Sequence, residues 1–444
     1  MRLIFLLGIL PLASVLSQGQ QATAVASLAQ APQDWYRGSG SSCLDSQLQY
    51  ETGAFPLHVD TGDIDGDGFQ DAVVANHFGN SITILYGTGN GLFFRSDEID
   101  VGANPVHIST GDINNDTFDD IVVSCRDSDE FFVFVSGTDG HSFSPLVQTM
   151  MGKAYAAIIT QMVPGGFSEL VFFSNECSTK VFGINENSEL YETAEYSGPC
   201  LASDALVGDF NNDSTPDVAY LDRAGSSSTI GVMLVNSQGG LLSHRTYPFA
   251  HEPQDFDTGD FNDDGFLDIA VANWGGGNGL VLINDRTGGY ELPLTIPAPM
   301  PHDVAVGDIN RDGHDDIVFS QLLTDTIEVH LGDGSGQFTL GETQGGAIND
   351  PRGLITLDIN SDGSDDIMQV VGGNRLVTYL NSCERILTGC DVDLDGNGEL
   401  NFFDVSAFIV FHSLGSDEAD INGDGLLNFF DVSLFLQLLQ MGCP

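Results

Sequence analysis

One nine-residue acidic pattern recurs along this chain of 444 residues, and its spacing constrains the fold more than any other feature. The pattern places Asp or Asn at positions 1, 3, 5 and 9, as in "DIDGDGFQD". A seventh copy, "QMVPGGFSELVFF" from Gln161, keeps the apolar frame, and we interpret it as having lost the acids. The six acidic copies are separated by 49, 97, 51, 48 and 50 residues, and the step of 97 spans two periods; they begin at Asp63, Asp112, Asp209, Asp260, Asp308 and Asp358.

Each repeat also contains four short apolar runs. A run such as "PVHIST" leads into the acidic loop, "DIVVS" leaves it, "EFFVFVSG" follows, and a Gly-rich turn precedes a fourth run. Four short strands per repeat, repeated seven times, predict a mainly β fold, a seven-bladed β-propeller of four-stranded blades. The alternatives are a β-helix and a string of separate small sandwiches. A β-helix would have much shorter periods, and separate units are disfavoured because a single four-stranded blade could not bury both of its faces.

The ends of the repeat region indicate how the ring closes. The last repeat has a third run, "RLVTYLN", but no fourth, whereas "QLQYETGAFP" precedes the first repeat and aligns with "DEIDVGANP" at an offset of 49 residues. We therefore expect the N-terminal strand to be the outer strand of the seventh blade. A disulfide between Cys43 and Cys383 would lock this closure.

The acidic loop differs from an EF-hand, because its twelfth residue counted from Asp63 is Val74. Alternate oxygen-bearing side chains in a tight loop favour a hard cation such as calcium, with position 7 offering its backbone carbonyl. A plain Asp/Asn/Gly turn is the alternative for one copy, but six copies in register disfavour it. The third repeat departs from the pattern at Gln161, Val163 and Gly165, so we expect no ion there.

About six ions are expected in the propeller. Their predicted ligands are Asp63, Asp65, Asp67, Phe69, Asp71, Asp112, Asn114, Asp116, Phe118, Asp120, Asp209, Asn211, Asp213, Thr215, Asp217, Asp260, Asn262, Asp264, Phe266, Asp268, Asp308, Asn310, Asp312, His314, Asp316, Asp358, Asn360, Asp362, Ser364 and Asp366.

These repeats resemble the FG-GAP/VCBS repeats of integrin-like propellers over about residues 45–382. The matching segments are "GDIDGDGFQDAVVAN", "GDFNDDGFLDIAVAN" and the turns "LYGTGNGLF" and "LGDGSGQF". The resemblance implies a seven-bladed propeller with calcium in the loops between the first and second strands.

The pattern changes after Cys390. "DLDGNGELNFFD" and "DINGDGLLNFFD" are twelve-residue loops with Gly at position 6 and an acid at position 12, and each leads into an amphipathic helix. This duplication resembles a dockerin, which implies two calcium ions and docking to a cohesin-like or cell-surface protein. The Phe-Phe pairs at positions 10 and 11 leave a purely structural calcium-stabilised cap as the alternative. The predicted ligands are Asp393, Asp395, Asn397, Glu399, Asn401, Asp404, Asp420, Asn422, Asp424, Leu426, Asn428 and Asp431.

The N-terminus, "MRLIFLLGILPLASVL", has the pattern of a secretory signal peptide, and no later segment is long enough to span a membrane. We expect a secreted, extracellular protein that could associate with the cell surface. Net charge of −51, from 64 acidic and 13 basic residues, argues against a nucleic-acid partner. The predicted domains are a signal peptide (1–26), a linker (27–44), the propeller (45–385) and the dockerin-like EF-hand domain (388–444).

Export permits disulfides. Cys177 and Cys200 should face each other on neighbouring blades, and Cys390 and Cys443 bracket the C-terminal module. Cys125 is left either free and buried or intermolecular.

A ring of residues should line the mouth of the central channel, because each precedes a motif Asp by five positions. Asn76, His77, Asn273 and Trp274 should lie on the same face. This mouth could be a carbohydrate site, a second metal site or an ordinary polar channel lining. The ring comprises His58, His107, Ala156, Asp204, Asp255, Asp303 and Gly353, with His302 and Arg352 adjacent.

Three functional classes remain open. The sequence favours a non-catalytic calcium-binding protein for extracellular adhesion or surface assembly. The alternatives are a glycan-binding propeller and an enzyme that degrades polysaccharides. We find no catalytic motif for a nucleophile, zinc or phosphate chemistry.

Overall fold

The computed structural model describes the propeller region and five isolated residues beyond it. The predicted signal peptide, the two C-terminal loops and the Cys43–Cys383 and Cys390–Cys443 pairs lie outside the described residues. None of the helices among the described residues is long and apolar enough to cross a membrane. The described residues are 44, 46–137, 142–149, 153–162, 168–185, 189–223, 228–249, 251–291, 293–345 and 349–381, with Val405, Phe408, Ile409, Val432 and Phe435.

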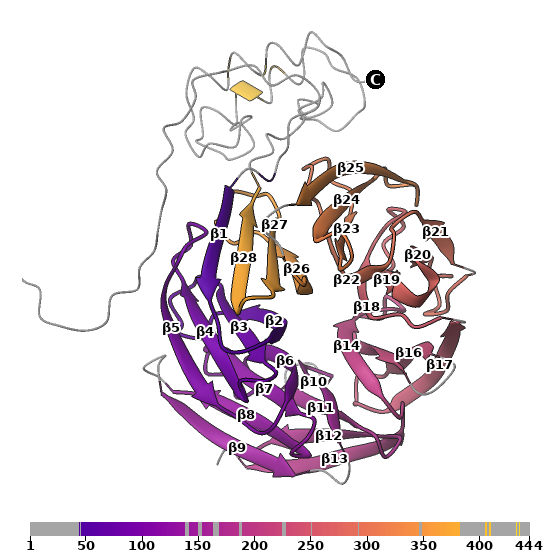
Figure 1. Cartoon of the computed structure of the whole chain (residues 1–444). Coiled ribbons are helices and arrows are strands. Elements are labelled where there is room, and N and C mark those ends of the chain that lie inside the picture. The colour runs from indigo at the N-terminus through magenta and orange to yellow at the C-terminus, as the bar shows by residue number, and fades with distance from the viewer. Residues whose placement is uncertain are drawn as a thin grey trace, which may run out of the picture. The chain divides into compact units, whose positions relative to one another are not determined.

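Seven four-stranded antiparallel sheets follow one another around a ring, which confirms the predicted seven-bladed propeller (Figure 1). The first, innermost strands of blades 1 to 7 are β2 (Pro56–Gly62), β6 (Pro105–Gly111), β10 (Ala154–Thr160), β14 (Ala202–Gly208), β18 (Asp255–Gly259), β22 (Pro301–Gly307) and β26 (Arg352–Leu357). The second strands are β3 (Asp71–Asn76), β7 (Asp120–Cys125), β11 (Glu169–Ser174), β15 (Asp217–Asp222), β19 (Asp268–Asn273), β23 (Asp316–Gln321) and β27 (Asp366–Val371).

The outer half of each blade completes the sheet. The third strands are β4 (Ser81–Gly87), β8 (Glu130–Ser136), β12 (Ser178–Ile184), β16 (Ser228–Val235), β20 (Asn278–Leu282), β24 (Thr326–Gly332) and β28 (Arg375–Leu380). The fourth strands are β5 (Phe93–Asp100), β9 (Phe143–Thr149), β13 (Leu190–Ser197), β17 (Leu241–Phe249), β21 (Leu294–Ile296), β25 (Phe338–Gly345) and β1 (Ser46–Glu51). A short 3₁₀ helix, η1 (Trp274–Gly276), follows β19.

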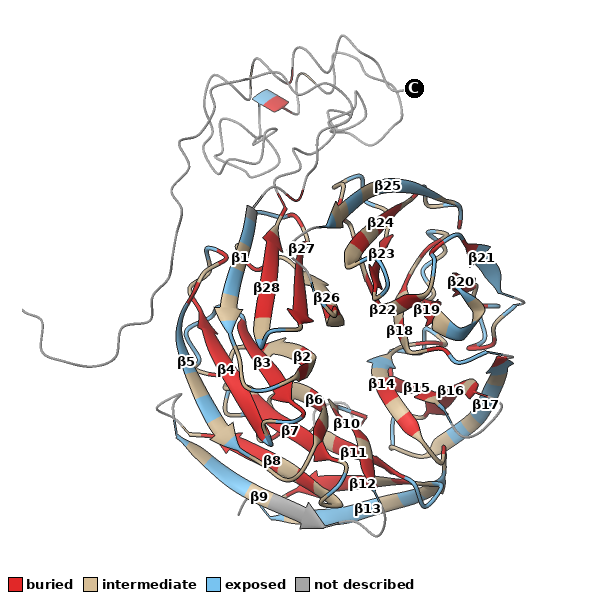
Figure 2. Ribbon diagram, in the orientation of Figure 1, coloured by how far each residue is buried: buried red, intermediate tan, exposed pale blue. Residues whose placement is uncertain are grey.

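Burial changes systematically from the middle of each blade to its edge (Figure 2). Every residue of β3, "DAVVAN", is buried, whereas β5 is mostly exposed. The second strands read as continuous apolar runs because neighbouring blades cover both of their faces. The fourth strands face solvent on one side and therefore carry polar residues.

Among the described residues, the core of the propeller consists of seven hydrophobic clusters, one at each interface between neighbouring blades. The apolar residue at position 2 of every loop belongs to the cluster shared with the following blade. Each loop is thereby anchored in an interface between two blades. These position-2 residues are Ile64, Ile113, Met162, Phe210, Phe261, Ile309 and Ile359.

The N-terminal strand closes the ring as the sequence predicts. β1 pairs antiparallel with β28, from Ser46 opposite Leu380 to Glu51 opposite Arg375. The Tyr50 side chain of β1 packs edge-on against Phe93 of blade 1, with ring centroids 5.1 Å apart. The outer strand of blade 7 thus also contacts the first blade.

The cysteines of the described region behave as expected. Cys177 and Cys200 form a disulfide between the hairpin of blade 3 and the start of blade 4, which confirms that pairing. Cys125 is free and buried at the end of β7. Of the two alternatives for Cys125, the structure therefore shows the buried thiol.

Candidate functional site

Six acidic loops connect the first and second strands of blades 1, 2, 4, 5, 6 and 7, and they share one hydrogen-bond pattern. The backbone N–H at position 6 donates to the position-1 carboxylate over 2.7–3.0 Å. The N–H at position 7 donates to the position-5 carboxylate over 2.9–3.1 Å. The six sequences therefore fold into the same loop, as their common spacing predicts.

Two left-handed backbone positions produce this loop shape. Gly66 and Gly68, at positions 4 and 6 of the first loop, have φ of 73° and 89°. Glycine adopts such angles without a steric penalty. Thr117 and Ser214 adopt them at position 6 with φ of 75° and 65°, which costs free energy for residues with a Cβ. The fixed turn explains why Gly is frequent at position 6.

The position-9 carboxylate is fully buried and forms the structural centre of each loop. One oxygen of Asp71 accepts a hydrogen bond from Ile64 N at 2.9 Å, and the other accepts from Gly87 N at 2.8 Å. The carboxylate therefore joins position 2 of the loop to the end of the third strand. Burial, the largest cause, and the nearby acids of the loop together raise the pKa of each position-9 carboxyl to about 7; these residues are Asp71, Asp120, Asp217, Asp268, Asp316 and Asp366.

Blade 3 corrects one interpretation of the sequence. Its loop was expected to have lost all its acids, but Glu169 stands at position 9 and accepts a hydrogen bond from Met162 N at 2.9 Å. The longer carboxylate makes the same bond to position 2 as Asp71 does in blade 1. Position 9 is thus acidic in all seven repeats, because the buried N–H needs an acceptor. Val163 and Gly165 lie outside the described residues, so the absence of an ion here stays a prediction.

The loops present oxygen atoms that suit a hard divalent cation. In the first loop, ligand oxygens of Asp63, Asp65 and Asp71 all lie within 4.8 Å of one another. Oδ1 of Asp63, Asn211 and Asn262 is buried without a hydrogen-bond donor in the part of the chain that the structure describes. In blades 2, 6 and 7 the position-3 Asn oxygen instead accepts from the position-5 N–H over 2.8–2.9 Å. In the first loop the position-3 oxygen of Asp65 likewise accepts from Asp67 N at 3.2 Å. An all-oxygen set with unpaired buried oxygens fits calcium, although four of the loops partly satisfy their own oxygens.

Neighbouring loops also contact one another, which sequence reasoning missed. The position-8 carboxylate of Asp119 in blade 2 accepts from Asp63 N of blade 1 at 2.8 Å. Asp315 and Asp365 make the same contact with the preceding blade at 2.7 and 2.9 Å. The repeated acid at position 8 of these three motifs was the available signal, since a metal ligand is not expected there. These carboxylates join consecutive loops.

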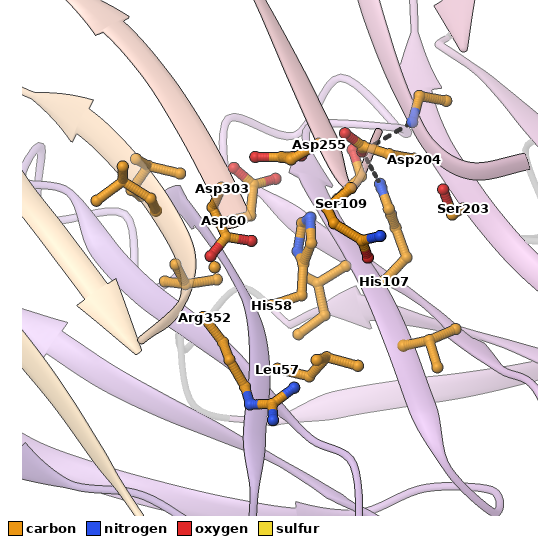
Figure 3. A pocket seen from close by; sticks show the side chains of 18 of the residues that line it. Leu57, His58, Asp60, His107, Ser109, Ser203, Asp204, Asp255, Asp303 and Arg352 are labelled. Atoms are coloured by element: carbon orange, nitrogen blue, oxygen red, sulfur yellow. Dashed lines mark hydrogen bonds and ion pairs between the residues drawn. The ribbon is translucent and has the colours of Figure 1, made fainter. Parts of the chain in front are cut away.

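A cavity of about 610 Å³ lies among the first strands, at their ends away from the acidic loops. It confirms most of the predicted ring, because His58, His107, Asp204, Asp255, Asp303 and Gly353 line it, with His77, His302 and Arg352. Figure 3 shows His58, His107, Asp204 and Asp255 gathered on one side of the cavity.

Four residues of the predicted mouth do not line the cavity, although Asn76 and Asn273 end the second strands β3 and β19 on its face as expected. Ala156 does not line the cavity and is fully buried in the core cluster between blades 3 and 4, because its side chain is too short to reach the channel. Asn76 is buried and donates to Thr83 at 2.9 Å, and Asn273 is buried and donates to Asn278 at 2.7 Å. Trp274 in η1 is also absent from the lining.

The cavity contains charged residues that the sequence analysis did not select. Arg126 and Arg223 lie six residues after a position-9 Asp, the same offset that identified His77. Asp60 and Asp257 lie two residues beyond the ring, and side chains alternate along a strand with a period of two. Both sequence offsets can be read from the repeat, so the sequence was sufficient to predict these four residues as part of the cavity lining.

The pKa values of two carboxyl groups in the cavity, those of Asp204 and Asp255, are shifted in opposite directions. Burial, followed by the charges of Asp204 and Asp303, raises the pKa of Asp255 well above its usual value. Burial also opposes ionisation of Asp204, but the hydrogen bond and charge of His107 outweigh it and lower the Asp204 pKa to about 2. Of these two hydrogen-bonded carboxyl groups, Asp255 therefore retains its proton more readily than Asp204.

Burial, the largest cause, and the neighbouring His107 together lower the pKa of His58 to about 3, so His58 is neutral at pH 7. The negative charge of Asp303 raises the pKa of His302 instead. His58 and His302 thus differ because the Asp303 carboxylate lies 3.0 Å from Nδ1 of His302 and outweighs burial there, whereas burial dominates at His58.

The C-terminal module is described at five residues only. Val405, Phe408, Ile409, Val432 and Phe435 are helical, and the buried rings of Phe408 and Phe435 stack with centroids 4.1 Å apart. These two rings occupy equivalent places in the two copies. All twelve predicted ligands of the module, from Asp393 to Asp431, lie outside the described residues.

Replacing the position-9 carboxylate should destabilise the propeller even without metal. Asp71→Ala leaves the buried N–H groups of Ile64 and Gly87 without that acceptor, so we expect a loss of about 2–4 kcal/mol in the free energy of unfolding. Urea unfolding in the presence of EGTA measures this loss. The matched control is Asp67→Ala, an exposed acid of the same loop, which should change stability far less. Equal effects of the two substitutions would contradict the role of the position-9 carboxylate as a clamp between the loop and the end of the third strand.

Comparisons with known proteins agree with this architecture. Residues 63–123 and 260–319 match the family model described as FG-GAP-like repeat. The crystal structure of BBS1N in complex with ARL6DN, soaked with lead, is similar with a TM-score of 0.54 and 12% identity, covering 75% of this chain and 95% of that chain. The mercury-soaked form gives a TM-score of 0.55 and 11% identity, covering 75% and 96%.

A protein from Lactobacillus plantarum gives a TM-score of 0.49 and 12% identity, covering 66% of this chain and 86% of that chain. No curated protein matches the sequence. At these identities the structural likeness concerns the fold alone. This chain therefore carries FG-GAP-like repeats on a seven-bladed β-propeller.

Proposed function

We propose that this chain is an extracellular, non-catalytic calcium-binding propeller that acts in adhesion or surface assembly. The observation that carries the proposal is the common structure of the six acidic loops. In each loop the position-2 N–H donates to a buried position-9 carboxylate. In the first loop the oxygens of Asp63, Asp65 and Asp71 also lie within 4.8 Å of one another. An FG-GAP-like propeller fits an adhesion-type protein.

The calcium ligands would be the side chains at positions 1, 3, 5 and 9 and the backbone carbonyl at position 7. A bound calcium ion supplies the positive charge that such a group of carboxylates lacks. The nearby acids of the loop contribute to the raised pKa of the position-9 carboxyl, as expected for charges that repel when no cation lies between them. Neutralisation of this repulsion would stabilise the loop and, through the position-2 residue, the adjoining interface between blades.

Two further features support action outside the cell as an assembly module. The Cys177–Cys200 disulfide is compatible with an oxidising compartment. The C-terminal region carries two twelve-residue loops with the spacing of a dockerin, and the two described Phe rings pack together between its copies. In this proposal the propeller is a rigid body and the C-terminal module binds a protein partner.

Calcium removal should lower the thermal stability of the full chain. A ligand present at 100 times its dissociation constant stabilises the folded state by about 2.7 kcal/mol per independent site. We expect EGTA to lower the melting temperature and calorimetry to detect about eight sites, six of them in the propeller. Asp67→Ala should remove about one site, whereas Gln161→Ala, at position 1 of blade 3, should remove none. A melting temperature unchanged by EGTA would refute the calcium proposal.

Docking should require the C-terminal module and calcium together. The full chain should bind the surface of its native cells in calcium, and a chain that ends at residue 385 should not. Binding is measured by flow cytometry with labelled protein, and EGTA provides the metal-free comparison. Equal binding of both chains would assign adhesion to the propeller instead of the module.

The cavity favours glycan binding as a second candidate function. Phe55 and Phe78 lie at its edge with ring centroids 4.4 Å apart, and Phe78 is 64% exposed. The Arg352 guanidinium lies over the Phe55 ring, 4.3 Å from its centroid. Exposed aromatic faces beside converging polar groups suit a sugar, which has an apolar ring face and hydroxyl groups.

Phe78→Ala should weaken binding of a glycan identified on an array by about tenfold, the usual effect of removing an aromatic anchor. Phe94→Ala is the matched control, because this residue of β5 is 74% exposed and does not line the cavity. If no glycan binds, or if both substitutions have the same effect, the glycan function is excluded.

A further inference from the structure

The wall of the cavity contains a group of side chains that differs chemically from the acidic loops. His58 on β2, His107 on β6 and Asp204 on β14 each offer one ligand atom, and these atoms all lie within 4.8 Å of one another. Nε2 of His107 is 3.2 Å from Oδ1 of Asp204. The His58 and His107 rings face each other with centroids 4.4 Å apart and planes inclined by 31°.

These three residues come from three different blades. His107 and Asp204 are separated by two repeats, yet their side chains meet across the channel (Figure 3). Ala156 occupies the same place on the intervening blade 3, and its short side chain stays in the core. The absence of a long side chain there leaves room for the contact between blades 2 and 4.

The histidines have nitrogens for which the described residues supply no partner. Nδ1 of His58 is buried without a hydrogen bond; Nδ1 of His107 is too, but the His107 atom that faces Asp204 is Nε2, so the unpaired atom relevant to the cluster is that of His58. Nearly all buried polar atoms in folded proteins are paired, and an exception often indicates a missing ion or water. The lining residues also include five Asp but only three Arg, so the cavity favours a cation.

We propose that His58, His107 and Asp204 bind one divalent transition-metal ion, with zinc as the expected occupant. Two imidazoles and one carboxylate suit zinc and similar ions, whereas calcium prefers oxygen alone. In a tetrahedral zinc site the ligand atoms lie about 3.4 Å apart, because each is about 2.1 Å from the ion. The 3.2 Å between His107 Nε2 and Asp204 Oδ1 is close to this value.

Three protein ligands leave a fourth coordination position open toward the cavity. Asp255 hydrogen-bonds Asp204, which would hold this ligand in place. The ion would add a Lewis-acidic position to a cavity that also contains Arg223 and Arg352. The site is separate from the acidic loops, so its test does not depend on the calcium proposal.

Zinc binding is measured by calorimetry on the full chain without a histidine tag, in millimolar calcium to occupy the acidic loops. We expect one tight Zn²⁺ site, a higher melting temperature with Zn²⁺, and a visible absorption band with Co²⁺ in its place. His107→Ala, His58→Ala and Asp204→Asn should each weaken Zn²⁺ binding by a factor of about 100 or more, since even indirect partners of metal ligands contribute 10- to 100-fold.

His302→Ala is the matched control, because His302 lines the same cavity but lies beside Asp303 instead of the cluster. This variant should keep both the Zn²⁺ affinity and the Co²⁺ absorption band. Circular dichroism and His→Gln variants identify any loss of binding that comes from misfolding. The proposal is overturned if the unmodified chain binds no Zn²⁺ in excess calcium, or if His58→Gln and His107→Gln leave its affinity unchanged.

Discussion

The hydrogen bonds of the buried position-9 carboxylate hold each blade together at its acidic end. One oxygen accepts from position 2 of the loop and the other from the end of the third strand, over 2.6–3.1 Å in the six acidic loops. Two buried N–H groups therefore depend on one side chain, and leaving them unpaired would be costly. Glu169 makes the position-2 bond in blade 3, where the other acids are missing. The clamp is thus part of the fold, whether or not a loop binds an ion.

The clamp connects the loops to the packing of the blades. Position 2 donates to the carboxylate and also inserts its apolar side chain into the cluster shared with the next blade, as Ile64 does between blades 1 and 2. Position-8 carboxylates extend the connection, because Asp119 accepts from the backbone of the preceding loop. A change of charge in one loop would therefore affect an interface between blades, which is how calcium could stabilise the whole ring.

The same first strands position the chemistry of the cavity. Side chains alternate along a strand, so residues five and three positions before most of the loops line the channel in two successive rings. The first ring contains His58, His107 and Asp204, and the second contains Asp60 and Asp257. Because all these positions recur with the repeat, the acidic loops and the cavity residues are arranged by a single periodicity.

The sequence by itself determined the number of blades, the position of the loops, the closing strand and the Cys177–Cys200 pair. These features depend on local spacing and on a hydrophobic pattern that repeats, both of which can be read along the chain. It also indicated most of the channel ring, although Arg126 and Arg223 were overlooked at an offset that was available. Only the tertiary structure decided that Ala156 turns into the core and that Asp119 joins two loops. It alone brought His107 and Asp204 together from blades two repeats apart, because such contacts depend on side-chain lengths and on how the blades are inclined around the ring.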